Sequence, residues 1–159
     1  MKRYDIVFSP TGGTKKVATL LGDALGGEVA SIDLTDCKQQ FPTIQLAQED
    51  AAIIAVPSYG GRVPAVATQR LALLSGHGAR AILVCVYGNR AYEDTLVELE
   101  DVAKQAGFRV IAAVAAVAEH SIARQFAAGR PDAQDAKQLS AFAGQIQAKL
   151  SAGDATEPA

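Results

Sequence analysis

The chain has 159 residues, with a hydrophobic fraction of 49%, a charged fraction of 20% and a formal net charge of −2. This length fits a single domain with its own core, and the near-neutral charge argues against nucleic acid or an anionic membrane as a partner. No apolar run reaches the roughly 18 residues that a membrane-spanning helix requires. Two cysteines, Cys37 and Cys85, are too few for a disulfide framework or a four-cysteine iron–sulfur site, so we expect a cytoplasmic protein.

Short apolar stretches alternate along the chain with longer amphipathic stretches, which is the pattern of strands alternating with helices. We predict strands over residues 4–8, 29–34, 51–56, 81–86 and 108–117, and helices over 15–25, 65–74, 91–106 and 132–150. Glycines follow the first helix, at Gly26 and Gly27, and Pro64 and Pro131 precede the second and the last. Residues 151–159 are small and polar and are expected to form a flexible tail, so the predicted domain spans residues 1–150.

This alternation predicts an α/β domain in which a five-stranded parallel sheet lies between two layers of helices, a three-layer sandwich. Ligands of such folds bind beyond the carboxyl ends of the strands, where neighbouring loops separate. The loops that follow the first, third and fourth strands are therefore interpreted together.

The loop after the first strand is rich in hydroxyl groups and glycine and leads directly into a helix. The first amides of a helix lack intrahelical partners and favour an anion, glycine lets a ligand approach the backbone, and hydroxyls donate to phosphate oxygens. The spacing is neither G-x-x-x-x-G-K-[ST] nor G-x-G-x-x-G, and the loop holds no cysteine, which argues against a nucleoside triphosphatase, a dinucleotide fingerprint and a cysteine phosphatase. The alternative is an ordinary turn with Thr14 as N-cap. The predicted phosphate-binding residues are Ser9, Thr11, Gly12, Gly13 and Thr14.

The loops after the third and fourth strands each place tyrosine beside glycine. They read Pro57-Ser58-Tyr59-Gly60-Gly61-Arg62-Val63-Pro64 and Tyr87-Gly88-Asn89-Arg90-Ala91-Tyr92-Glu93-Asp94. A tyrosine ring offers a stacking face and a polar tip, so a flat ring could lie between these loops. The alternative is a pair of ordinary turns whose tyrosines belong partly to the core. Three such loops at three expected strand ends favour a binding site.

Together these loops resemble the flavodoxin family, and most closely the flavodoxin-like domain that is joined to a bacterial-type ferredoxin module. The resemblance covers about residues 3–150, extends to Glu119-His120-Ser121 and to residues 128–132, and implies the strand order 2-1-3-4-5. The chain departs from that group in having no Cys-x-x-Cys-x-x-Cys run, so any iron–sulfur partner would be a separate protein. It also lacks tryptophan and the large negative charge of acidic flavodoxins.

The resemblance implies FMN as cofactor, with Lys15 joining the first loop around its phosphate. From the loop charges we further predict that Arg62 and Arg90 flank the isoalloxazine ring, where a cation would raise the reduction potential of the flavin, an effect that Glu93 and Asp94 could cancel. His120 and Arg130 are assigned either to the cofactor site or to the support of their own loop and helix. The residues implied around the ring are Pro57, Ser58, Tyr59, Gly60, Gly61, Tyr87, Gly88, Asn89, Arg90, Tyr92 and Asp94.

The expected function is electron transfer by a monomer or weak dimer, with a ferredoxin or a flavin reductase as electron partner. The alternative is an FMN-dependent oxidoreductase that uses NADH or NADPH or reduces a quinone. A phospho-acceptor signalling domain is disfavoured, because the first and third strands end in Phe8-Ser9-Pro10 and Val56-Pro57, without carboxylates. A binding module that has lost the cofactor is a further alternative.

Overall fold

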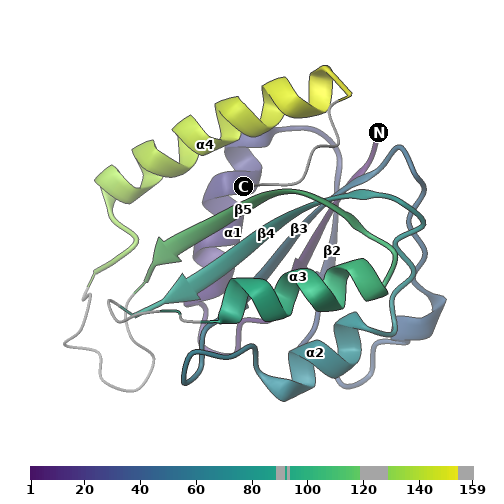
Figure 1. The fold of residues 1–159 in the computed structure, drawn as a ribbon. Coiled ribbons are helices and arrows are strands. Elements are labelled where there is room, and N and C mark those ends of the chain that lie inside the picture. Colours follow the sequence, from purple (N-terminus) through teal and green to yellow (C-terminus); the bar gives the residue numbers. More distant parts are fainter. Residues whose placement is uncertain (89–91, 93, 119–128, 154–159) are drawn as a thin grey trace.

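Five parallel strands form a single sheet in the computed structural model, which describes residues 1–88, 92, 94–118 and 129–153 (Figure 1). Neighbouring strands pair in parallel in the order β2-β1-β3-β4-β5, which confirms the predicted flavodoxin-like fold. The strands are β1 (Arg3–Val7), β2 (Val29–Asp33), β3 (Ala51–Pro57), β4 (Arg80–Tyr87) and β5 (Arg109–Val117).

Helices cover both faces of the sheet, with α1 and α4 on one face and α2 and α3 on the other (Figure 1). The central strand β3 is buried along its whole length. Its neighbouring residues Ile53 and Ile54 pack into opposite helical layers, as the alternation of a strand requires. The helices are α1 (Gly13–Leu25), α2 (Ala65–Leu71), α3 (Thr95–Gln105) and α4 (Ala133–Ser151).

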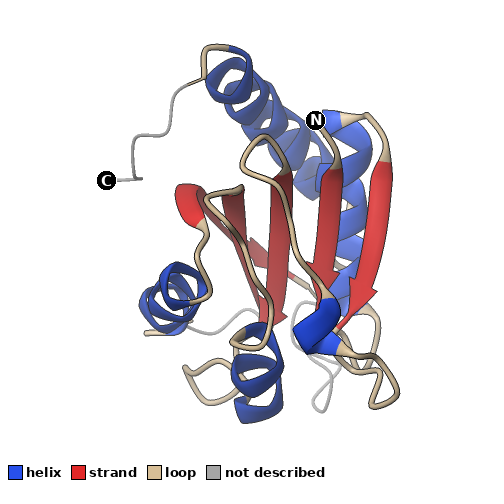
Figure 2. Cartoon of the chain, turned by 90° about the vertical axis from the view of Figure 1, so that its right-hand side faces the viewer, coloured by secondary structure: helices blue, strands red, loops and turns tan. Residues whose placement is uncertain are grey.

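The strands end together at one edge of the sheet, as the arrowheads of Figure 2 show. Backbone pairing continues just beyond the strands: the Phe8 amide donates to Ala55 O at 3.0 Å and the Ser58 amide to Val86 O at 2.8 Å. The Ala118 amide likewise donates to Tyr87 O at 3.0 Å. The loops after β1, β3 and β4 are therefore held side by side where they leave the sheet.

Three boundaries differ from the prediction by more than one residue, each for a local physical reason. Helix α1 begins at Gly13 because Gly12 is the N-cap, in the left-handed conformation with φ 97°, so Thr14 is not the N-cap. Helix α2 ends at Leu71 rather than at residue 74, because Ser75 pairs with the preceding connection through Ile44 O and the Leu46 amide. Helix α3 begins at Thr95, and part of the predicted extension to residue 91 lies outside the described residues.

Candidate functional site

The start of α1 has the donor pattern of an anion-binding site, and we call it the cradle. Gly12 supplies no side chain to cap the helix, and within the described part of the chain the amides of Gly13 and Thr14 have no hydrogen-bond partner. The next amide, that of Lys15, donates to Ser9 Oγ at 2.9 Å, and the Lys16 amide makes the first helical bond, to Gly12 O. Two unpaired amides at the positive end of a helix dipole create a strong preference for an anion.

Hydroxyl groups extend this cradle. Thr14 is only 5% exposed and its hydroxyl makes no hydrogen bond with the described residues, while Thr11 lies exposed beside it. Behind the loop, a Cβ added to Gly13 would lie 3.4 Å from the Cβ of Ala118, so the end of β5 packs closely against it. Among the described residues that line this part of the site, the donors are amides and hydroxyls rather than cations.

A tight turn carries Tyr59 beyond the end of β3. The Tyr59 amide donates to Arg62 O at 2.9 Å and the Arg62 amide donates back to Tyr59 O at 3.1 Å. Between them Gly60 and Gly61 have φ values of 58° and 76°, a conformation that residues with a Cβ rarely adopt. Tyr59 itself is 43% exposed, which is unusual for so large a ring and places it at the surface of the site.

Glu98 of α3 holds this turn in place. Its carboxylate accepts hydrogen bonds from Arg62 Nε at 2.9 Å, from Arg62 Nη2 and from the Val63 amide at 2.7 Å. The hydrogen-bonded Arg62 guanidinium lowers the pKa of Glu98 below its ordinary value. The charge of Arg62 is thus offset by Glu98, which reduces the effect expected of this cation on a flavin. Sequence reasoning missed Glu98, whose partners lie 36 and 35 residues away.

The second wall of the site is a tyrosine pair after β4. The rings of Tyr87 and Tyr92 lie 5.3 Å apart between centroids, tilted by 54°. The Ser58 hydroxyl donates to Tyr92 O at 3.5 Å and lies 2.7 Å from Oγ1 of the fully buried Thr95, so it ties the loop after β3 to the start of α3.

A cleft joins the first loop to the two tyrosine-bearing loops. Pro10, Val86 and Ala118 line part of it. The rest of its lining consists of eight predicted residues: Thr11, Gly13, Thr14, Pro57, Ser58, Tyr59, Tyr87 and Gly88. Five of the other predicted residues do not line it: Gly12, Gly60, Gly61, Tyr92 and Asp94. Ser9 and Lys15 line a separate groove beside α1. Asn89, Arg90 and His120 lie outside the described residues.

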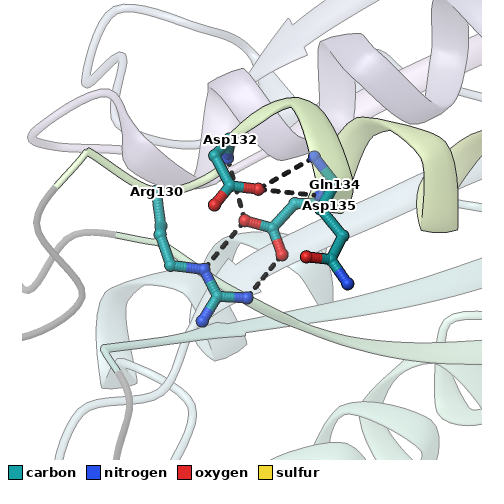
Figure 3. A network of polar contacts seen from close by, with 4 residues as sticks. All are labelled: Arg130, Asp132, Gln134 and Asp135. Carbon is teal, nitrogen blue, oxygen red and sulfur yellow. Dashed lines mark hydrogen bonds and ion pairs between the residues drawn. The ribbon is translucent and has the colours of Figure 1, made fainter.

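Arg130 belongs to the start of α4 (Figure 3). Its Nε and Nη2 donate to the two carboxylate oxygens of Asp135 at 2.8 and 2.5 Å. Asp132 completes a capping box: its Oδ1 accepts from the Gln134 and Asp135 amides, and its own amide donates to Asp135. Of the two roles considered for Arg130, the structure supports the anchoring of α4.

The fold is that of the flavodoxins. No protein-family model and no curated protein matches the sequence. Among solved structures, the Streptococcus pneumoniae TIGR4 flavodoxin is 22% identical over 94% of this chain and 99% of its own, with a TM-score of 0.63. Oxidised flavodoxin 1 from Bacillus cereus is 16% identical over 92% and 97%, with a TM-score of 0.66. The apo form of the NADH:FMN oxidoreductase EmoB is 16% identical over 94% and 88%, with a TM-score of 0.62.

Neither a membrane-spanning helix nor a cluster of metal ligands is found among the described residues. Within the described ranges, no helix is both long and apolar enough to cross a bilayer. Among those same residues, no group of three or more His, Cys, Asp or Glu side chains is placed to hold a metal ion.

The Arg130 network predicts an acid-sensitive contribution to stability. Hydrogen bonding to Arg130 lowers the pKa of Asp135 from 3.8 to about 2. A carboxyl group whose pKa is lower in the folded state stabilises the fold above its unfolded pKa, and this contribution is lost as the pH falls from about 4 to 2. Asp135→Asn is expected to lower the free energy of unfolding at pH 7 by about 1–2 kcal/mol. Urea denaturation measured from pH 7 to pH 2.5 should show the difference shrinking.

Asp132→Asn is the matched control, because asparagine caps a helix about as well as aspartate. Its stability should stay within a few tenths of a kcal/mol of the parent chain. Equal losses in both variants, or a loss for Asp135→Asn that does not change with pH, would contradict this account of the network.

Proposed function

We propose that residues 1–150 form an FMN-binding domain that transfers electrons between redox partners. One observation carries the proposal: a single cleft is lined both by the uncapped start of α1 and by Tyr59 and Tyr87. A helix N-terminus with free donors and two tyrosines in one cleft suit a ligand that has a phosphate at one end and a flat ring at the other. The flavodoxin fold supports this assignment.

The residues present fit FMN in their chemistry. A phosphate monoester needs several donors, and the Gly13 and Thr14 amides together with the Thr11 and Thr14 hydroxyls supply them. A Cβ at Gly12 or Gly60 would meet open space, so both glycines present accessible backbone toward solvent.

Each part of the cleft would have a defined task. Bound FMN would supply the redox chemistry, since a flavin accepts and donates electrons one or two at a time. The first loop would fix the phosphate, Tyr59 and Tyr87 would cover the ring and exclude water, and the Gly60–Gly61 turn would present peptide groups at its edge. The proposed electron partner is a separate protein, either a ferredoxin or a flavin reductase. The proposed oligomeric state is a monomer or weak dimer, and the proposed location is the cytoplasm.

The cradle predicts discrimination between FMN and riboflavin, which lacks the phosphate. Titration with FMN should quench flavin fluorescence at a ratio of one to one. Riboflavin should bind at least about 100-fold more weakly, because it forgoes two or more charge-assisted hydrogen bonds. Thr14→Val should weaken FMN roughly tenfold and leave riboflavin unchanged. Equal affinities for the two flavins would show that the first loop does not bind the phosphate. If a chain with a native circular dichroism spectrum bound neither flavin, the proposed function would be rejected.

Glu98 is predicted to act through the Tyr59 turn. Glu98→Ala removes the acceptor of three hydrogen bonds that hold Arg62 and Val63, so Tyr59 would no longer be held against the ring. We expect FMN affinity to fall about tenfold and the midpoint potential of the bound flavin to shift. Fluorescence titration and redox titration measure the two effects.

Glu100→Ala is the control for this experiment, because Glu100 lies on the same helix and pairs with Lys104 rather than with the turn. It should change neither quantity. If both variants behaved alike, the effect would belong to the charge or stability of α3 and not to the turn.

A second candidate function, an FMN-dependent NAD(P)H or quinone oxidoreductase, is favoured by one observation. A cavity of about 170 Å³ lies between β5 and α4; Tyr87 lines both this cavity and the cleft, and Phe142 and Gln138 offer it an aromatic and a polar wall. One structural neighbour is an NADH:FMN oxidoreductase. For an electron carrier we expect no steady-state oxidation of NADH or NADPH with FMN and a quinone present. Sustained turnover that Phe142→Ala abolishes would favour the enzyme.

A further inference from the structure

Another cavity, of about 180 Å³, lies beside the first loop on the side away from the cleft. It is a groove between α1 and the edge strand β2, walled by Ala18 and Thr19 and floored by Ser31 and Asp33. The cleft lies at the ends of β3 and β4, whereas the groove lies at β2, and these strands are on opposite sides of β1. A ligand anchored on the loop after β1 could therefore extend in both directions.

The end of the groove that meets the cradle offers a second set of phosphate contacts. Ser9 and Lys15 belong to the first loop but line the groove rather than the cleft. Ser9 Oγ accepts from the Lys15 amide, which leaves the hydroxyl hydrogen to donate. The Lys15 side chain is exposed and makes no hydrogen bond or ion pair with the described residues. One phosphate on Gly13 and Thr14 would leave these two groups for an adjoining phosphate.

Farther along, Asp33 stands at the carboxyl end of β2. Its Oδ1 accepts from the Thr35 amide at 2.8 Å and from Thr35 Oγ1 at 2.6 Å, which orients the carboxylate, and Oδ2 has no partner among the described residues. Asp33 follows Gly13 by 20 residues. In dinucleotide-binding folds, a carboxylate about 20 residues after the glycine-rich loop, at the end of the next strand, binds the ribose hydroxyls. This chain lacks the G-x-G-x-x-G spacing, but Asp33 stands at the corresponding distance and strand end. The other groove carboxylate, Asp5, is already paired with Arg3 at 3.0 Å.

We propose that the α1–β2 groove binds the adenosine half of FAD, with the pyrophosphate spanning the first loop and Lys15 and with the ribose on Asp33. The inference rests on the proposed flavin function and extends its ligand from the mononucleotide to the dinucleotide. The flavin ring and its nearer phosphate keep the positions proposed for FMN, so the groove decides only how well the adenosine extension is accepted.

The experiment compares FMN and FAD by fluorescence titration of the cofactor-free full chain and of groove variants. The parent chain should bind FAD at least as tightly as FMN. Thr19→Trp and Ser31→Trp fill the groove from its two walls, and each should weaken FAD at least tenfold while leaving FMN unchanged. Asp33→Ala should weaken FAD alone, about tenfold. Ala24→Trp, on an exposed position of α1 outside the groove, is the control and should change neither affinity.

The possible outcomes distinguish failure of the groove proposal from failure of the proposed flavin function. FMN binding with FAD at least tenfold weaker would overturn the groove assignment and leave the proposed function standing. FAD binding that neither tryptophan variant weakens would also overturn it, because the adenosine would lie elsewhere. ADP binding to the groove while FMN saturates the cleft, without tighter binding of FAD, would assign the groove to a free nucleotide and overturn the proposal. Failure of both flavins to bind would reject the proposed function itself.

Discussion

The burial of β3 on both faces is the constraint on which the site depends. All seven residues of this strand are buried, and Ile53 and Ile54 pack into opposite helical layers. A strand with this environment must lie in the middle of the sheet, with partners on both sides. It pairs with β1 and β4, so the loops after these three strands meet at one edge whatever their own sequences are. The apolar core thus decides where a ligand can bind before any polar residue of the site is considered.

Helix α3 fixes the position of the loop after β3 at this edge of the sheet. In its first turn, the Thr95 hydroxyl forms a hydrogen bond with the Ser58 hydroxyl. The Glu98 carboxylate accepts hydrogen bonds from Arg62 and from the Val63 amide. Both contacts hold the loop after β3, which has no regular structure beyond its two-glycine turn. A turn that supports an exposed aromatic ring has little burial of its own, so its position has to be imposed by a neighbouring rigid element. The fixed end of α3 is that element.

Much of this arrangement could be predicted from the sequence, because it rests on short-range patterns. The apolar periodicities place all five strands and four helices to within a few residues, and hydroxyl and glycine residues mark the first loop. What could not be predicted depends on pairs that are distant in sequence. The inward turn of the Ser58 hydroxyl needs Thr95, and the neutralisation of Arg62 needs Glu98, each more than 30 residues away.

The role of Arg130 is an instructive exception. Asp132 and Asp135 stand three residues apart directly after Pro131, which is close to the signature of a capping box and is visible in the sequence. A guanidinium just before such a box is well placed to pair with its carboxylates, as Arg130 does with Asp135. The pairing of Arg130 could therefore be predicted from neighbouring residues. The competing assignment arises because a cation near a predicted anion site is also a candidate for binding the ligand. The structure favours the helix-capping role, because Arg130 Nε and Nη2 both donate to the Asp135 carboxylate.

The groove beside β2 follows from the geometry of helices on a five-stranded sheet. Strands are spaced about 4.8 Å apart and a helix with its side chains is about 10 Å wide, so two helices cover about four strands. Helix α1 lies against β1, β3 and β4 and α4 against β5, so none of the described helices packs over the face of β2 on that side. Val29, Ser31 and Asp33 are accordingly exposed, whereas Ile32 points into the opposite core. Apolar residues there would create an exposed patch, and polar residues alone would create a plain surface. Instead, the uncovered strand carries a carboxylate oriented by Thr35, and Ser9 and Lys15 of the first loop line the same groove. These are the groups on which the proposed adenosine site depends.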